Sequence, residues 1–236
     1  MSAFFNTICK LVRNEKVEKI IIKCEANLLN LDLLYEALIS SDVSVFIDGL
    51  DLSDNELNET HIKALSKVAS VLPNLKRLTL KYNNFGDSII ELFEYIPGIE
   101  YLNVDQCSIQ LDHDGSLDML PNLREFSASY NNLGSIGIQL LIDAMPGVQT
   151  VDVQHNYIHG LLRLKNIKVL YVNGNRLDGR AINQILRSKT LKFADFRHNP
   201  GSDDAIVKNS NQTAIIMSYA KKRSESVRAG DCIIVR

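Results

Sequence analysis

Residues 75–85 read LKRLTLKYNNF, and residues 123–133 read LREFSASYNNL. Both stretches place apolar side chains at the first, fourth, sixth and eleventh positions and an asparagine at the ninth. The template recurs along the chain, with its ninth position at Asn27, Asn55, Asn83, Cys107, Asn131, Asn156, Asn175 and Asn199. Subtracting successive positions gives spacings of 28, 28, 24, 24, 25, 19 and 24 residues. Repeats of this length predict a solenoid, in which each copy packs mainly against its neighbours.

The residues within one copy predict its local structure. The alternating apolar positions, such as Leu78 and Leu80, favour a short strand with one buried face. The asparagine turns the chain out of the strand, and its amide can bond backbone groups that would otherwise be buried without a partner. Stacked copies therefore predict a ladder of asparagines. Cys107 occupies the same position, where we interpret it as a small buried residue rather than a reactive thiol.

Helical spacing of apolar residues marks several of the segments between strands. The predicted helices cover residues 62–72, 89–96, 138–145 and 182–186. Ser88 and Glu91 have the spacing of a capping box at the start of the second of these helices. The 19-residue interval from Asn156 to Asn175 has no room for a full helix, so its outer part is predicted to be an extended or single-turn segment.

The repeats resemble those of leucine-rich-repeat proteins over residues 17–201, and the irregular lengths are similar to the ribonuclease-inhibitor-like class and its relatives. The resemblance implies an α/β fold: a curved right-handed horseshoe with a parallel sheet on the concave side and helices on the convex side. An open solenoid end needs a cap. Helical caps are expected from residues 1–16 and from residues 202–236, where residues 214–220 form an apolar cluster, so that 1–236 is a single domain.

Composition and motifs exclude several function classes. The formal charge of −2, from 26 Lys and Arg and 28 Asp and Glu, does not favour a nucleic-acid partner, and no apolar run reaches the length of a membrane span. The four scattered cysteines favour a reducing, cytoplasmic compartment. The five histidines form no metal motif, and Asp48, Asp51 and Asp54 lack the remaining features of a calcium loop. We expect no catalytic residues, no metal and no cofactor.

The strand positions that point away from the core are the candidate binding site. They carry five aromatic residues, with a sixth just beyond the asparagine, and several cations, which is a composition typical of protein-binding surfaces. The predicted partner-binding residues are Arg77, Lys81, Tyr82, Tyr101, Tyr130, Asp152, His155, Tyr157, Tyr171, Arg176, Phe193 and Arg197.

These observations predict a non-catalytic module, monomeric on its own, whose concave face binds a partner protein. The sharper hypothesis is that it blocks the active site of a partner enzyme. Two alternatives remain: a scaffold that joins two proteins without inhibition, and an enzyme with a site built across repeats from Tyr130, Asp152 and His155. The layout and the Asn-, Ile- and Lys-rich composition also resemble small leucine-rich-repeat effector or effector-regulating proteins of intracellular bacterial pathogens. That resemblance implies a cytoplasmic location, which is the host cytosol for a delivered protein.

Overall fold

A computed structural model describes residues 20–23, 30–40, 43–112, 117, 119–202 and 215–217. Nine strands in this part of the chain form one parallel sheet whose order follows the sequence. The strands are β1 (Ile20–Lys23), β2 (Ile47–Asp51), β3 (Arg77–Thr79), β4 (Tyr101–Asn103), β5 (Glu125–Ser127), β6 (Thr150–Asp152), β7 (Val169–Tyr171), β8 (Phe193–Asp195) and β9 (Ile215–Met217).

The apolar repeat positions align from strand to strand. Leu50 pairs in register with Leu78, and the same row continues to Ala194 in β8. Every member of the row from β2 to β8 is buried. Ile22 pairs with Leu50, so the first copy of the repeat, whose ninth position is Asn27, also contributes a strand to the sheet. The prediction of short parallel strands with one buried face is therefore confirmed.

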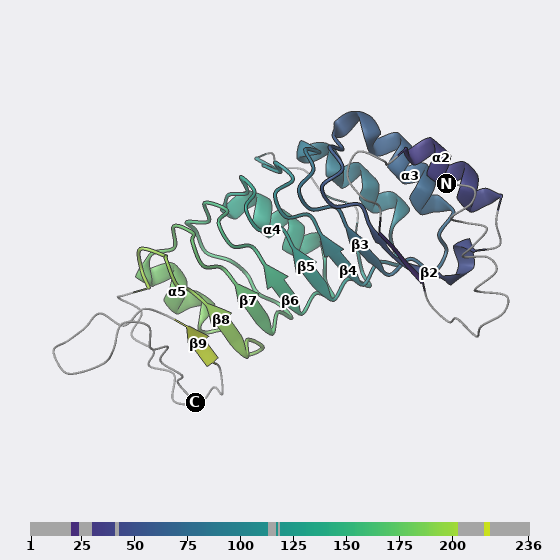
Figure 1. Cartoon of the computed structure of the whole chain (residues 1–236). Helices are drawn as coiled ribbons and strands as arrows, with labels where there is room; N and C mark the ends of the chain where they lie inside the picture. Colours follow the sequence, from purple (N-terminus) through teal and green to yellow (C-terminus); the bar gives the residue numbers. More distant parts are fainter. Residues whose placement is uncertain are drawn as a thin grey trace, which may run out of the picture.

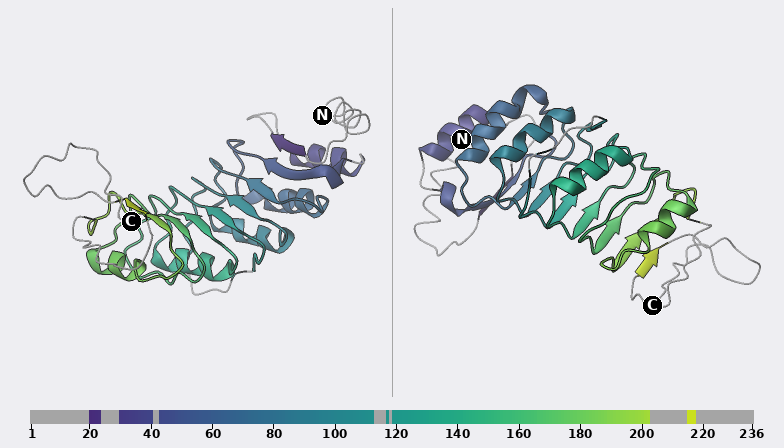
Figure 2. Two further views of the ribbon diagram at one scale, coloured as in Figure 1. Left: turned by 90° about the horizontal axis from the view of Figure 1, so that it is seen from below. Right: turned by 180° about the vertical axis from the view of Figure 1, so that it is seen from behind.

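The outer side of the stack carries the helices, while the sheet lines the inner side (Figures 1 and 2). The helical elements are α2 (Leu31–Ile39), α3 (Ile62–Ser70), α4 (Ser135–Ala144), α5 (Gly179–Ile185) and the 3-10 helices η1 (Ser44–Phe46), η2 (Glu59–His61) and η3 (Gly86–Tyr95). Helices α3, α4 and α5 confirm three of the predicted segments. Their buried faces pack on the strands to close a continuous core.

The remaining helix differs from its prediction. The segment that contains Ile89 and Leu92 is the 3-10 helix η3, and it begins at Gly86. No side chain caps its first turn, so the capping box predicted for Ser88 and Glu91 is wrong. Ser88 lies inside the helix because the chain turns into it directly after leaving the asparagine turn.

The C-terminal apolar cluster also differs from its prediction. A helix was expected here, but Ile215–Met217 forms strand β9, which pairs in parallel with β8. An open sheet edge leaves backbone N–H and C=O groups without partners, and an additional strand satisfies them. Residues 1–16, which carry the predicted N-terminal cap, lie outside the described residues, and so do 203–214 and 218–236, which include the basic segment Lys221–Arg228 and Cys232.

The predicted asparagine ladder is present and connects neighbouring coils by hydrogen bonds. Asn175 shows the pattern: its Oδ1 accepts the backbone N–H groups of Asn156 and Ile158, each at 2.9 Å. Its Nδ2 donates to the carbonyl oxygens of Val153 and Val172, each at 2.9 Å. Ladder bonds of this kind also come from Asn83, Asn131, Asn156 and Asn199.

Candidate binding surface

The sheet register brings the predicted binding residues into rows across the concave face. One row runs Arg77, Tyr101, Glu125, Thr150, Val169 and Phe193, and the next runs Thr79, Asn103, Ser127, Asp152, Tyr171 and Asp195. Neighbouring strands lie about 4.8 Å apart, so side chains in one row are in reach of one another. Figure 2 (left) shows the curvature of the sheet that carries these rows.

A further row follows the strands, at the residue before each ladder position. Its members share a left-handed backbone with φ between 51° and 68°: Asp54, Tyr82, Gln106, Tyr130, His155, Gly174 and His198. This conformation is uncommon for residues other than glycine. It recurs because the chain must turn sharply here for the next residue to enter the ladder. We call this set the turn row.

Three tyrosines at this edge of the sheet are about half exposed. Tyr82 and Tyr130 belong to the turn row, and Tyr157 directly follows a ladder asparagine; their exposed fractions are 48%, 55% and 49%. Tyr157 also has a positive φ, of 60°. Large aromatic surfaces held out of the core by a fixed backbone are suited to contact with another molecule.

Ring stacking orders the centre of the turn row. The rings of Tyr130 and His155 lie 4.3 Å apart with an interplanar angle of 17°. The His155 ring in turn lies over Gly174, where a Cβ atom would come within 2.3 Å of it. Gly174 therefore leaves the space that the imidazole occupies. The result is a stack that runs across three adjacent strands and fixes the orientation of the exposed Tyr130 ring.

Cations lie over three other tyrosine rings. The guanidinium carbon of Arg77 is 4.6 Å from the centroid of Tyr101, and that of Arg176 is 4.5 Å from the centroid of Tyr157. The Lys81 ammonium lies 5.3 Å from the Tyr82 ring. Such contacts contribute about 0.5–1 kcal/mol at exposed sites and hold both groups in place.

Toward the C-terminal end, Tyr171 and Phe193 form a second aromatic pair, with centroids 5.2 Å apart. Beside them, the Arg197 guanidinium bonds both carboxylate oxygens of Asp195, with Nη2 to Oδ2 at 2.7 Å and Nε to Oδ1 at 2.9 Å. Asp195 is buried, so Arg197 is fixed by this pair rather than extended toward solvent.

Hydrogen-bonded polar groups occupy the middle of the concave face. Asp105 accepts from Ser127 Oγ at 2.7 Å, and Asp152 accepts from Ser129 Oγ at 2.6 Å. Gln154 Nε2 also donates to both oxygens of Asp152. Burial raises the pKa of the Asp152 carboxyl above its ordinary value, although the hydrogen bonds from Ser129 and Gln154 oppose that rise.

Of the three residues in the cross-repeat catalytic alternative, Tyr130 and His155 lie against each other and Asp152 has other hydrogen-bond partners. The oxygens of Asp152 bond to Ser129 and Gln154. Burial also raises the pKa of the Cys107 thiol to about 12, which keeps it protonated at neutral pH. Among the described residues, no group of three or more His, Cys, Asp and Glu side chains is placed to hold a metal ion.

The structure thus gathers the predicted residues into two groups. Arg77, Lys81, Tyr82 and Tyr101 lie toward the N-terminal end, and the other eight lie on β6–β8, on the turns after these strands and, for Tyr130, after β5. Neither the space that Gly174 leaves for the His155 ring nor the positive φ of the turn row was predicted from the sequence. A glycine or aspartate at this position in two repeats was the available signal.

Two grooves on the outer side of the solenoid were also not predicted from the sequence. One lies between α3 and η3, and the other lies beside α4 near Leu161. No helix in the described part of the chain is long and apolar enough to cross a membrane.

No protein-family model and no curated protein sequence matches this chain. Among solved structures, the chain is similar to the crystal structure of the leucine-rich repeat domain of APL1B, with a TM-score of 0.51 and 16% identity over 83% of this chain and 61% of that one. It also matches TLR13 in the crystal structure of the TLR13–ssRNA13 complex, with a TM-score of 0.47 and 15% identity over 81% of this chain and 31% of that one. The chain therefore spans less than two thirds of either. Together with the parallel sheet and outer helices, the first match shows that the fold is a leucine-rich-repeat solenoid.

Proposed function

We propose that the chain is a non-catalytic protein-binding module whose concave face engages a partner protein. The observation that carries this proposal is the row of half-exposed tyrosines, Tyr82, Tyr130 and Tyr157, at one edge of the sheet. The left-handed backbone and the ring contacts fix these side chains before any partner arrives. A partner that buries them gains apolar contact with little loss of side-chain entropy.

The charges of the concave face favour a shaped protein partner over a nucleic acid. Acidic side chains, including Asp105, Glu125 and Asp152, lie in the middle of the face, where they would repel a phosphate backbone. The cations Arg77 and Arg176 lie over tyrosine rings toward the two ends. This alternation suits a folded surface with charges of both signs.

Inhibition of a partner enzyme is the finer form of the proposal. A curved sheet can hold a protruding loop, and a partner held by a loop that borders its active site would have access to that site restricted. The support for this step is the concave shape together with the fixed aromatic edge. A scaffold uses the same face but leaves the activity of its partner unchanged, so the two functions differ in a measurable way.

Affinity capture with three forms of the protein tests the proposed face. In the first variant, Tyr82→Ala/Tyr130→Ala/Tyr157→Ala, the exposed edge is removed; the matched control, Leu33→Ala/Tyr95→Ala/Met119→Ala, removes exposed apolar side chains elsewhere. We expect the wild type and the control to retain one major partner and the tyrosine variant to lose it, with all three folded by circular dichroism. Loss of the partner in the control alone assigns binding to another face and contradicts the proposal.

The captured partner then separates the functions. An inhibitor reduces the partner's enzymatic activity to a plateau at equimolar ratio, whereas a scaffold leaves that activity intact. The enzymatic alternative requires that Asp152→Ala and His155→Ala abolish the biological effect while the partner is still captured.

A further inference from the structure

Two neighbouring helices on the outer side of the solenoid are separated by a coil that has none. The chain runs from β6 to β7 without a helix, and this is the coil with the 19-residue spacing. Figure 2 (right) shows α4 and α5 on either side of this extended segment. Toward the N-terminus, by contrast, α2 packs on α3 and α3 packs on η3, although the described part of the coil from β4 to β5 also has no helix.

An open groove of about 540 Å³ lies along α4 at this place. Ile136 and Leu140 line it from α4, Leu161 from the extended coil and Gln184 from α5. The exposed fractions of Ile136 and Leu161 are 57% and 45%. The groove therefore presents apolar side chains that a helix of the intervening coil would cover if the coil had one.

A polar group in the wall of the groove also has no partner. Gln139 Oε1 accepts the backbone N–H of Arg163 at 2.8 Å, which fixes the side-chain amide. Its Nε2 is buried and has no acceptor among the described residues. A buried donor of this kind is costly to leave unpaired.

The charges around the groove are predominantly positive. Asp143 is its acidic member, and it is paired with Arg163 and Lys165 at 3.6 Å and 3.3 Å. Arg180 lies four residues before Gln184 on α5, which places the two on the same side of that helix, and Arg187 follows just beyond the helix end. Asp178, two residues before Arg180, adds a second carboxylate, and four cations against two carboxylates still give the groove a net positive surround.

The wider charge distribution limits the length of an anionic occupant. Residues 148–202 contain nine Lys and Arg against three Asp, a net charge of +6. Residues 31–105 contain five Lys and Arg against 13 Asp and Glu, a net charge of −8. A long polyanion on the basic half would extend toward the acidic half and be repelled, whereas a short acidic segment would not.

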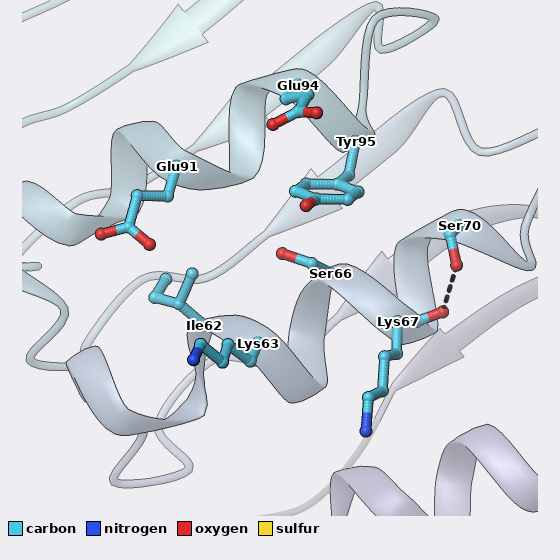
Figure 3. Close-up of a pocket in the computed structure, with 8 residues that line it drawn as sticks. All are labelled: Ile62, Lys63, Ser66, Lys67, Ser70, Glu91, Glu94 and Tyr95. Carbon is cyan, nitrogen blue, oxygen red and sulfur yellow. Dashed lines mark hydrogen bonds between the residues drawn. The ribbon is translucent and has the colours of Figure 1, made fainter.

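The groove between α3 and η3 provides an internal comparison (Figure 3). It has a similar volume, about 610 Å³, but Lys63 and Lys67 on α3 are balanced by Glu91 and Glu94 on η3. The two helices that flank it also pack directly on each other. The groove beside α4 differs from it in two ways: its flanking helices are separated by a coil without a helix, and its surround has an excess of positive charge.

We propose that the groove between α4 and α5 is a docking site for a short acidic, amphipathic segment of a partner protein. Its apolar side chains cover Ile136 and Leu161, and its carboxylates face Arg163, Arg180 and Arg187. This site lies on the outer side of the solenoid and is independent of the concave face, so either proposal can fail without the other.

Selection from a phage-displayed library of random 16-residue peptides tests this assignment without assuming a sequence. We expect the recovered peptides to be rich in Asp and Glu, with Leu or Phe at helical spacing. Their binding to the purified chain should weaken at least tenfold in Ile136→Glu/Leu161→Glu, and again in Arg180→Ala/Arg187→Ala. It should be unchanged in the controls Leu33→Glu and Lys63→Ala/Lys67→Ala and in the variant that lacks the three concave tyrosines.

Three results overturn the proposal. One is recovery of peptides that are basic or uncharged, and another is recovery of peptides that bind the groove variants and the wild type equally. The third is concentration-dependent self-association of the wild type, by sedimentation velocity, that Ile136→Glu/Leu161→Glu abolishes; it would assign the groove to a second copy of the chain. Because the substituted side chains are exposed, the variants are expected to keep the wild-type melting temperature, which circular dichroism checks.

Discussion

At the scale of the residue, the turn row links the fold to the proposed function. The left-handed backbone that delivers Asn131 and Asn156 to the ladder also turns Tyr130 and His155 toward one another. The same geometry therefore serves the core on one side and the binding edge on the other. The left-handed backbone costs conformational free energy at each turn-row residue, and substitution of a single residue can measure that cost.

Gln106 isolates the backbone cost, because it is an exposed member of the turn row with φ of 51°. We expect Gln106→Val to be less stable than Gln106→Gly by about 1–2 kcal/mol, since a β-branched residue disfavours the left-handed region that glycine adopts freely. Urea unfolding followed by circular dichroism measures the difference. Equal stabilities of the two variants would mean that the turn does not impose this conformation.

Cys107 tests the burial of the ladder position. Its Sγ donates to the carbonyl oxygen of Leu80 at 3.3 Å, and its pKa is raised to about 12 from an ordinary value of 9.0. In a variant in which Cys9, Cys24 and Cys232 are serine, we expect the remaining thiol to react with a disulfide reagent at pH 8 only after unfolding. Rapid labelling of the native protein would contradict the buried placement.

The raised pKa of Cys107 also has a consequence for stability. The unfolded thiol loses its proton near pH 9, while the native thiol holds it until about pH 12. The contribution of Cys107 to the free energy of unfolding is therefore complete below pH 9 and falls as the pH rises through this window. Comparison with Cys107→Ala, measured in this range of pH, isolates that contribution.

At the scale of the element, the sequence predicted most of the coils but not all of their details. Apolar spacing located α3, α4 and α5, and the 19-residue interval correctly indicated a coil without a helix. It did not predict that η3 is a 3-10 helix or that Ile215–Met217 is a strand. The apolar spacing of a short segment fits both a helix and a strand. Residues 215–217 form a strand because they pair with the open edge of β8, and that edge exists only in the assembled sheet.

The asparagine ladder joins neighbouring coils by hydrogen bonds, and Asn175 makes three of them. We expect Asn175→Ala to lower the free energy of unfolding by about 3 kcal/mol, since it leaves the buried N–H groups of Asn156 and Ile158 and the C=O of Val153 without their partners. The carbonyl of Val172 keeps its bond from Asn199 Nδ2. Asn166→Ala is the matched control; the side chain of Asn166 is exposed and donates one bond, to the carbonyl of Pro146. If both variants lower the free energy of unfolding by less than about 1 kcal/mol, the ladder does not contribute measurably to stability.

At the scale of the whole molecule, curvature and charge give the solenoid two distinct surfaces. The concave face has fixed aromatic rings and mixed charges, whereas the outer groove beside α4 is apolar with a basic surround. The repeats predicted which residues face inward, because the period of a strand follows from the sequence. Contacts between repeats, such as the His155 ring over Gly174, arise only when the coils are stacked, so one copy of the repeat cannot reveal them.

Site-specific photo-crosslinking tests the concave binding face most directly. A photoreactive benzoylphenylalanine replaces Tyr130 in one form and Leu33, an exposed residue of α2, in another. In the complex with the captured partner, we expect a covalent product from position 130 and none from position 33. A product from position 33 with none from position 130 would show that the partner binds the outer side, and would contradict the central claim.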